Sequence, residues 1–191
     1  AAGPVDVAKT TPTFALASYV ELDYGVTDPS AMTLVGPKMF VAKAAAFFEV
    51  RFRLGVTLAD NTAEAAIGFV DAVPASAGDI LGDIDTPTFA GGIADAAVFG
   101  VDTDQTLKTF AAVTIGTSTA VGATTIAGAA PFTQPTINVD VIYRVELRSA
   151  SPDSSVSTAF FFINDNLVVE RVGPDAEKLL TPVVFWGMRG T

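Results

Sequence analysis

The sequence has no cysteine and no histidine in its 191 residues. The lack of cysteine excludes disulfide bonds, thiolate metal sites and thiol nucleophiles. The lack of histidine removes the commonest general base and the commonest zinc ligand. Catalysis would have to use carboxylates, hydroxyls, lysine or tyrosine, so most hydrolase mechanisms are excluded. We therefore expect a protein that is not an enzyme and that holds no resident cofactor.

Positive charge is also scarce. The chain has 11 lysine and arginine residues against 21 acidic residues, which gives a net charge of −10 and an isoelectric point near 4.2. Such a surface repels phosphate backbones and anionic lipids, so we expect neither a nucleic-acid nor a membrane partner. Only 17% of the residues are charged, and the mean hydropathy is +0.46. This balance favours a homo-oligomer whose subunits cover part of each other's surface.

The longest stretch without a charged residue covers residues 109–139. Glycines, prolines and β-branched residues interrupt it, which is typical of strands and a loop and not of a membrane-spanning helix. Because interface cores are depleted in charge, we expect this stretch to contact other subunits. Residues 1–12 have no periodic face and predict an extended arm before a single domain over residues 13–191. The predicted interface residues are Pro4, Val5, Ala123, Ala127, Pro131 and Phe132.

Apolar and polar residues alternate with a period of two in several segments, as in the half-buried strands of an antiparallel sheet. Residues 164–166, Asn-Asp-Asn, predict a tight hairpin turn because these residues tolerate left-handed backbone angles. Short helical turns are expected only at residues 42–48 and 175–180, and residues 74–92 predict irregular structure. The predicted strands cover residues 13–24, 48–56, 64–72, 96–102, 107–115, 141–149, 160–163, 167–169 and 183–188. This pattern predicts an all-β sandwich or barrel.

One exterior sheet face is expected to carry ion pairs. Alternation places Arg51 and Arg53 on the same exterior face as Arg144 and Arg148, with Glu49 and Glu146 as their partners. Residues 160–162 are all phenylalanine, so both faces of that strand are aromatic and one ring is expected to pack outside the core. Trp186 lies in an apolar strand, where a core or interface position is expected.

Several segments together resemble the concanavalin A-like (laminin G-like) jelly-roll domains. They are FFEVRFRL at 47–54, IGFVDA at 67–72, YRVELR at 143–148, FFFINDNLVVERV at 160–172 and LTPVV at 180–184. The resemblance spans residues 13–190 and implies an antiparallel two-sheet jelly-roll sandwich, here with an extended N-terminal arm. Such domains are frequent in the structural proteins of tailed bacteriophages.

The resemblance therefore implies a non-enzymatic virion structural protein. We expect a capsid decoration or cement protein, or a head-fibre or tail component, that is made in the host cytoplasm and acts on the outer surface of the capsid or tail. Its partners would be further copies of itself and the major capsid protein or another virion protein. The expected mechanism is burial of surface between subunits.

Two other functions stay open. The first is a carbohydrate-binding, lectin-like module that binds a host surface glycan, with sugar-binding candidates that form no motif: Tyr24, Asn61, Asn138, Asn164, Asn166 and Trp186. The second is a divergent glycoside hydrolase. A glucanase of this fold would carry Glu-x-Asp-x-x-Glu, and residues 21–26 have valine at the last acidic position. The pair of carboxylates that such hydrolysis requires is therefore missing.

A calcium site is the remaining candidate. Asp79, Asp83 and Asp85 lie close together in one predicted loop, and calcium binds six to eight oxygen ligands of this kind. Their spacing does not fit the helix-loop-helix calcium pattern, and the legume-type metal site of this fold includes a histidine that the chain lacks. A solvated acidic loop is the simpler interpretation, with no metal bound.

Overall fold

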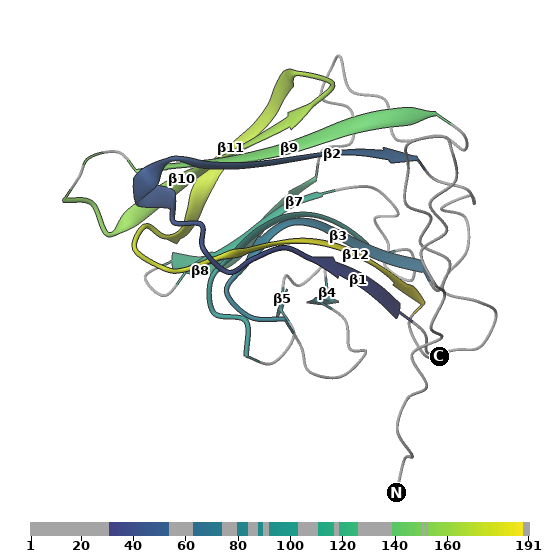
Figure 1. Cartoon of the computed structure of the whole chain (residues 1–191), viewed down its shortest axis with the longest axis horizontal. Helices are drawn as coiled ribbons and strands as arrows, with labels where there is room; N and C mark the ends of the chain where they lie inside the picture. The colour runs from purple at the N-terminus through teal and green to yellow at the C-terminus, as the bar shows by residue number, and fades with distance from the viewer. Residues whose placement is uncertain are drawn as a thin grey trace, which may run out of the picture.

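A computed structural model of the chain contains two antiparallel β-sheets that pack face to face (Figure 1). The structure describes residues 31–53, 63–73, 80–83, 88–89, 92–102, 111–116, 119–125, 139–149, 151 and 153–188. Within these residues the one helical segment is the short η1 helix, Ala42–Ala44. The prediction of an antiparallel two-sheet sandwich is confirmed.

The larger sheet has six strands in the order β1-β12-β3-β6-β7-β8. The strands are β1 (Ala31–Val35), β3 (Ala63–Val70), β6 (Ala96–Asp102), β7 (Ala111–Gly116), β8 (Thr119–Thr125) and β12 (Thr181–Met188). Its central strands are rich in alanine, valine and phenylalanine and show no polar alternation. Strands of this composition are typically buried on both faces of a sheet. The structure shows what covers each face.

One face of the larger sheet packs on the smaller sheet, and the other is covered by the short hairpin of β4 (Leu81–Asp83) and β5 (Thr88–Phe89), which lies below it in Figure 1. Two apolar clusters result. Phe99 of β6 lies in the cluster between the sheets, while its neighbour Val98 lies in the cluster on the opposite side. The larger sheet is therefore the middle layer of the molecule.

The smaller sheet has four strands in the order β11-β10-β9-β2. They are β2 (Ala46–Arg53), β9 (Asp140–Ser149), β10 (Val156–Ile163) and β11 (Asn166–Asp175). Burial alternates residue by residue along β9 and β10, as expected of a sheet with one face in the core and one in solvent.

Aromatic rings fill the space between the two sheets. The ring of Phe99 contacts Phe161 edge to face with centroids 5.0 Å apart, and it contacts Tyr143 at 5.1 Å. Trp186 is only 5% exposed and belongs to the same cluster, which confirms its predicted position in the core. These contacts join β6, β9, β10 and β12 into one core.

Predictions of local structure were right at some places and wrong at others. The short helical turn expected within residues 42–48 is the three-residue η1, whereas residues 175–180 contain a turn and no helix. Residues 74–92 were expected to be irregular, yet β4 and β5 pair within them. Strand β1 was not predicted, because only five residues pair at the sheet edge. The predicted strand at 13–24 and the predicted arm at 1–12 lie outside the described residues.

Candidate functional site

The solvent-facing side of the smaller sheet carries most of the exposed chemistry in the described part of the chain. We call this surface the outer face. It is formed by the outward residues of β2, β9, β10 and β11, whose registers place them in rows across the sheet. These residues are Phe47, Glu49, Arg51, Arg53, Asp140, Ile142, Arg144, Glu146, Arg148, Thr158, Phe160, Phe162, Leu167, Glu170 and Val172.

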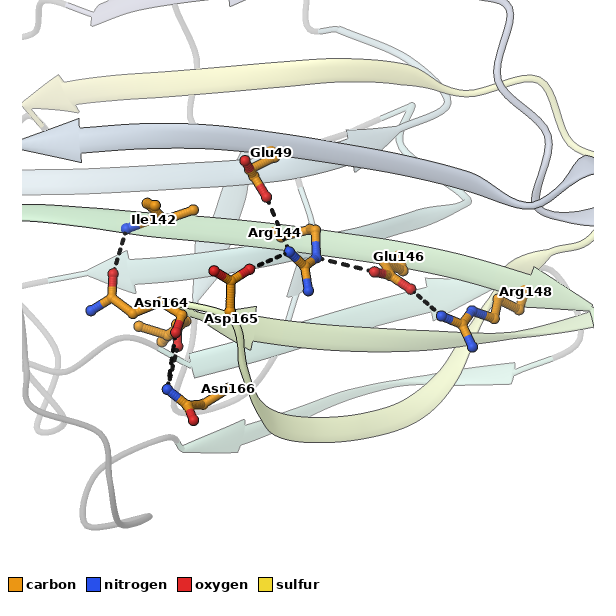
Figure 2. A network of polar contacts seen from close by, with 9 residues as sticks. Glu49, Ile142, Arg144, Glu146, Arg148, Asn164, Asp165 and Asn166 are labelled. Carbon is orange, nitrogen blue, oxygen red and sulfur yellow. Dashed lines mark hydrogen bonds and ion pairs between the residues drawn. The ribbon is translucent and has the colours of Figure 1, made fainter.

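Arg144 is the centre of the polar network on the outer face (Figure 2). Its Nη1 donates hydrogen bonds to Asp165 Oδ1 at 2.6 Å and to Glu49 Oε2 at 3.1 Å. Its Nε lies 3.0 Å from Glu146 Oε1. Burial lowers the pKa of Arg144, but the hydrogen bonds to Asp165 and Glu49 and the charge of Glu146 outweigh it, so the pKa lies above its ordinary value. One guanidinium therefore gathers carboxylates from three different segments.

The β10–β11 turn supplies the other half of this network. Asn164 and Asp165 have φ angles of 48° and 64°, which are the left-handed values that a two-residue hairpin turn requires. The turn is fixed to β9 because Ile142 N–H donates to Asn164 Oδ1 at 2.9 Å and Asn164 N–H donates to the Ile142 carbonyl at 2.9 Å. The predicted hairpin is confirmed, with Asn166 as the first residue of β11.

We call Glu49, Arg144, Asn164 and Asp165 the tip cluster. They come from β2, β9 and the hairpin turn, and the side chain of Asp165 is 73% exposed. Carboxylate oxygens accept hydrogen bonds, a guanidinium donates them and an amide does both. The tip cluster thus offers donors and acceptors to solvent within a few ångströms of one another.

Two phenylalanine rings lie outside the core, where the sequence predicted one. The guanidinium of Arg144 lies 4.4 Å from the ring centroid of Phe162, and that of Arg148 lies 5.0 Å from that of Phe160. Such contacts between a cation and a ring are attractive and cover apolar surface. The arginines on β9 thereby make an aromatic surface compatible with water.

The predicted ion pairs of the outer face are confirmed for Arg144 and Arg148 but not for the arginines of β2. Both Arg51 and Arg53 pair with Asp140, at 3.7 Å and 2.5 Å, and not with Glu49. Cross-strand register explains the difference, because Arg53 lies directly opposite Asp140 while Glu49 lies opposite Arg144. The hydrogen bond from Arg53 lowers the pKa of Asp140.

Few of the other predicted site residues can be placed. Ala123 was predicted in a glycine-interrupted segment and lies on β8, opposite Val113 of β7. Trp186 is buried, so it cannot serve as a platform for a sugar. Asp83 lies in β4, and no group of three or more acidic side chains among the described residues could hold a metal ion. The remaining predicted positions lie outside the described residues, namely Pro4, Val5, Tyr24, Asn61, Asp79, Asp85, Ala127, Pro131, Phe132 and Asn138.

A second polar cluster was missed from the sequence. Asp71 and Asp95 are almost fully buried at the ends of β3 and β6, and Lys178 Nζ lies 3.5 Å and 3.6 Å from their carboxylates. Asp95 Oδ1 also accepts a hydrogen bond from Asp175 N–H at 2.7 Å. Single acidic residues at the ends of apolar strands look like ordinary turn residues, so no sequence signal separates this buried pair from exposed ones.

Comparison with known proteins identifies solved structures with a similar fold. No protein-family model and no curated protein matches the chain. Among solved structures, the Emp46p carbohydrate recognition domain matches with a TM-score of 0.52 and 9% identity, over 83% of this chain and 71% of that one. The Emp47p carbohydrate recognition domain matches with a TM-score of 0.49 and 13% identity, over 85% and 71% of the two chains. An endo-β-1,4-glucuronan lyase from the fungus Trichoderma reesei matches with a TM-score of 0.49 and 7% identity, over 88% and 78%.

The chain has a concanavalin A-like jelly-roll fold. At 9% identity the likeness to the Emp46p domain extends to the fold alone, and the site must be argued from this chain's own residues. Within the described residues, no helix is long and apolar enough to cross a membrane.

Proposed function

We propose that this concanavalin A-like domain is a non-enzymatic module that binds carbohydrate through the tip cluster. The observation that carries the proposal is the pair of exposed carboxylates, Glu49 and Asp165, that the Arg144 guanidinium holds together beside the Asn164 amide at the end of the sheet. Sugar hydroxyls both donate and accept hydrogen bonds, so a site that binds them needs both kinds of partner at close range. The similar Emp46p structure is itself a carbohydrate recognition domain, which supports this choice of ligand.

The arrangement of the carboxylates argues for binding over hydrolysis. A glycoside hydrolase needs one carboxylic acid that protonates the leaving oxygen and a second carboxylate that attacks or activates water. In the tip cluster, Glu49 and Asp165 both accept hydrogen bonds from Nη1 of Arg144. The same guanidinium thus holds one oxygen of each carboxylate and leaves the other oxygen to accept hydrogen bonds from a ligand.

A glycan array tests the proposal. We expect the parent protein to bind a defined set of glycans, and Asp165→Gly to weaken that binding by about tenfold or more, since a hydrogen bond to a charged group is lost. Glycine fits the φ of 64° at this position, so the turn is preserved. Asp153→Ala removes an exposed carboxylate from the β9–β10 connection and is the matched control, with unchanged binding. Absence of any glycan binding by the parent, or equal binding by Asp165→Gly, would refute the proposal.

A virion structural role is the second candidate, and the exposed apolar surface favours it. Nine large hydrophobic side chains are exposed in the described residues, and a partner subunit that covered them would remove this apolar surface from water. They are Leu34, Val35, Met39, Phe47, Val73, Val139, Leu167, Val172 and Leu179. Under this proposal the protein is a capsid decoration or cement protein, or a head-fibre or tail component, on the outer surface of a tailed-phage particle.

Assembly through residues 109–139 is the test of this second candidate. Ala123 lies on β8, the last strand of the larger sheet within the described residues. A charge on an edge strand is compatible with folding but opposes burial against a partner. We expect Ala123→Asp to keep the melting temperature of the parent and to lose binding to tailed-phage particles. Unchanged binding of Ala123→Asp would show that this stretch is not the contact.

A further inference from the structure

The outer face has two chemically different halves. The tip cluster occupies the half near the β10–β11 turn. The other half, which we call the distal half, contains Phe47, Glu146, Arg148, Phe160, Glu170 and Val172. Phe47 is 65% exposed and Val172 is 49% exposed, whereas large apolar side chains are normally buried. The distal half therefore exposes apolar surface beside ordered charges, and it adjoins the tip cluster at the ion pair between Glu146 and Arg144.

Charge makes the outer face suitable for contact with a second copy of the chain. With the turn residue Asp165 included, the outer face has four arginines (51, 53, 144 and 148) and five carboxylates (49, 140, 146, 165 and 170), so its formal charge is −1. The chain as a whole has a net charge of −10, so almost all of this excess lies elsewhere. Two copies repel each other when their acidic surfaces approach, but they bring little net charge together when their outer faces meet.

The order of charges along β9 is self-complementary. Glu146 and Arg148 follow one another on the outward side of this strand. A two-fold axis that lies in the interface and crosses β9 between them places each Glu146 opposite the Arg148 of the other copy. An isologous contact repeats every pair, so two such ion pairs form. Arg148 has capacity for a second carboxylate, because its side chain is 58% exposed and it pairs with Glu146 of its own chain through Nη2.

The same axis also matches the two aromatic residues of the distal half. On β10 it places Phe160 opposite Thr158, and on β2 it places Phe47 opposite Ala45, since β2 and β10 both flank β9 in register. On β11 it places Val172 opposite Glu170, so the match does not extend to that strand. A large ring over a small side chain is the complementarity that sheets packed face to face require. We propose that two copies of this chain form a symmetric dimer through the distal half of the outer face. This inference goes beyond carbohydrate binding and does not depend on it.

Charge reversal tests the two-fold axis directly. Glu146→Arg gives a copy with two arginines at positions 146 and 148, and Arg148→Glu gives a copy with two glutamates. Each variant alone places like charges opposite one another twice, so we expect its dissociation constant to rise by at least about tenfold. A mixture of the two variants places opposite charges together at both contacts, so we expect a one-to-one heterodimer. Light scattering after size-exclusion chromatography measures each mass, and circular dichroism melting curves verify that both variants fold.

A pair of apolar variants provides the matched control. Phe47 and Met39 are both 65% exposed, but only Phe47 belongs to the outer face. Phe47→Glu is expected to shift the parent dimer to monomer, while Met39→Glu leaves it dimeric. The proposal is overturned if the parent is monomeric at the highest attainable concentration. It is equally overturned if the single charge reversals stay dimeric, if their mixture stays monomeric, or if Met39→Glu disrupts the dimer as Phe47→Glu does.

Discussion

Asn164 and Asp165 show how single residues define the tip cluster. Their positive φ angles turn the chain within two residues, and this brings the Asp165 carboxylate to 2.6 Å from Arg144. Asparagine and aspartate adopt such angles more readily than other residues with a side chain, because their short polar groups can hydrogen-bond locally. The same two residues therefore satisfy the backbone and supply polar groups to the surface.

The first prediction separates these two roles of Asp165. Asp165→Pro imposes φ near −65° where the turn has +64°, so we expect the free energy of unfolding to fall by about 1–3 kcal/mol. Asp165→Gly loses the same carboxylate but keeps the turn, so we expect a smaller change. Urea denaturation of both variants measures the difference. Equal losses would mean that the ion pair with Arg144, and not the backbone angle, determines stability here.

The second prediction concerns the pH dependence of Asp140. The hydrogen bond from Arg53 lowers the pKa of Asp140 from 3.8. A carboxyl group with a lowered pKa in the folded state stabilises the fold above its unfolded pKa, and this contribution is lost as the pH falls through the folded pKa. Parent and Asp140→Asn should therefore differ in stability at neutral pH and converge below pH 3.8.

Urea denaturation at a series of pH values measures this convergence. Arg53→Gln is the control variant, because it removes the donor and leaves Asp140 in place. The stability of Arg53→Gln should therefore depend less on pH than that of the parent below pH 3.8. A stability difference between parent and Asp140→Asn that stays constant to the lowest pH would contradict the argument.

Strands β3 and β6 show how an element adapts to burial on both faces. The pair lies in the centre of the larger sheet, where both apolar clusters contact it. Gly68 of β3 has a φ of +153°, and a Cβ atom placed there would lie 2.2 Å from the carbonyl oxygen of Ala97. The contact is with backbone, which cannot move aside without distorting the sheet. Glycine at this position therefore permits the close approach of the two strands.

The third prediction follows from this close approach. Gly68→Ala should lower the free energy of unfolding by about 2–4 kcal/mol, because overpacking and backbone strain add. Gly92 is the matched control, since it also has a positive φ, +98°, but a Cβ atom placed there would have no neighbour within 4 Å. Gly92→Ala should cost only about 1 kcal/mol of backbone strain. Thermal unfolding of both variants distinguishes steric from conformational cost, and equal losses would contradict this explanation.

At the scale of the whole molecule, one ion cluster with two buried carboxylates joins three distant parts of the chain. Asp71 follows β3, Asp95 precedes β6, and Lys178 lies in the β11–β12 connection. Asp71 N–H also donates to the Asp95 carbonyl at 2.9 Å, which closes the base of the segment that carries β4 and β5. The cluster therefore holds the covering hairpin in place over the larger sheet.

The fourth prediction compares this buried cluster with an exposed ion pair. Asp95 is fully buried, so Asp95→Ala should destabilise the protein by about 1–3 kcal/mol, because the Asp175 N–H loses its acceptor while the partly exposed Lys178 keeps Asp71 as a partner. Glu177 pairs with Lys43 at a shorter distance, 2.7 Å, but both side chains are exposed. Glu177→Ala should cause no measurable loss. Denaturant unfolding of the two variants tests whether burial, and not distance, sets the contribution.

The sequence by itself determined the strands with one solvent face and the turn between two of them. Strands β2 and β9 alternate because only one side of the smaller sheet is buried, and this pattern is local enough to be recognised residue by residue. The Asn164–Asp165 turn was equally evident, since the backbone angle depends on these residues alone. The pairing of Glu146 with the arginines of β9 followed from the same alternation.

Only the tertiary structure decided which residues meet across the sheets. The burial of both faces of β3 and β6, the pairing of Asp140 with the β2 arginines and the Asp71–Asp95–Lys178 cluster all depend on strand order and register. Those partners lie tens of residues apart, and a shift of one residue in register would turn each side chain to the opposite face. Alternation shows that a side chain leaves the core, but the neighbouring strands determine what it touches there.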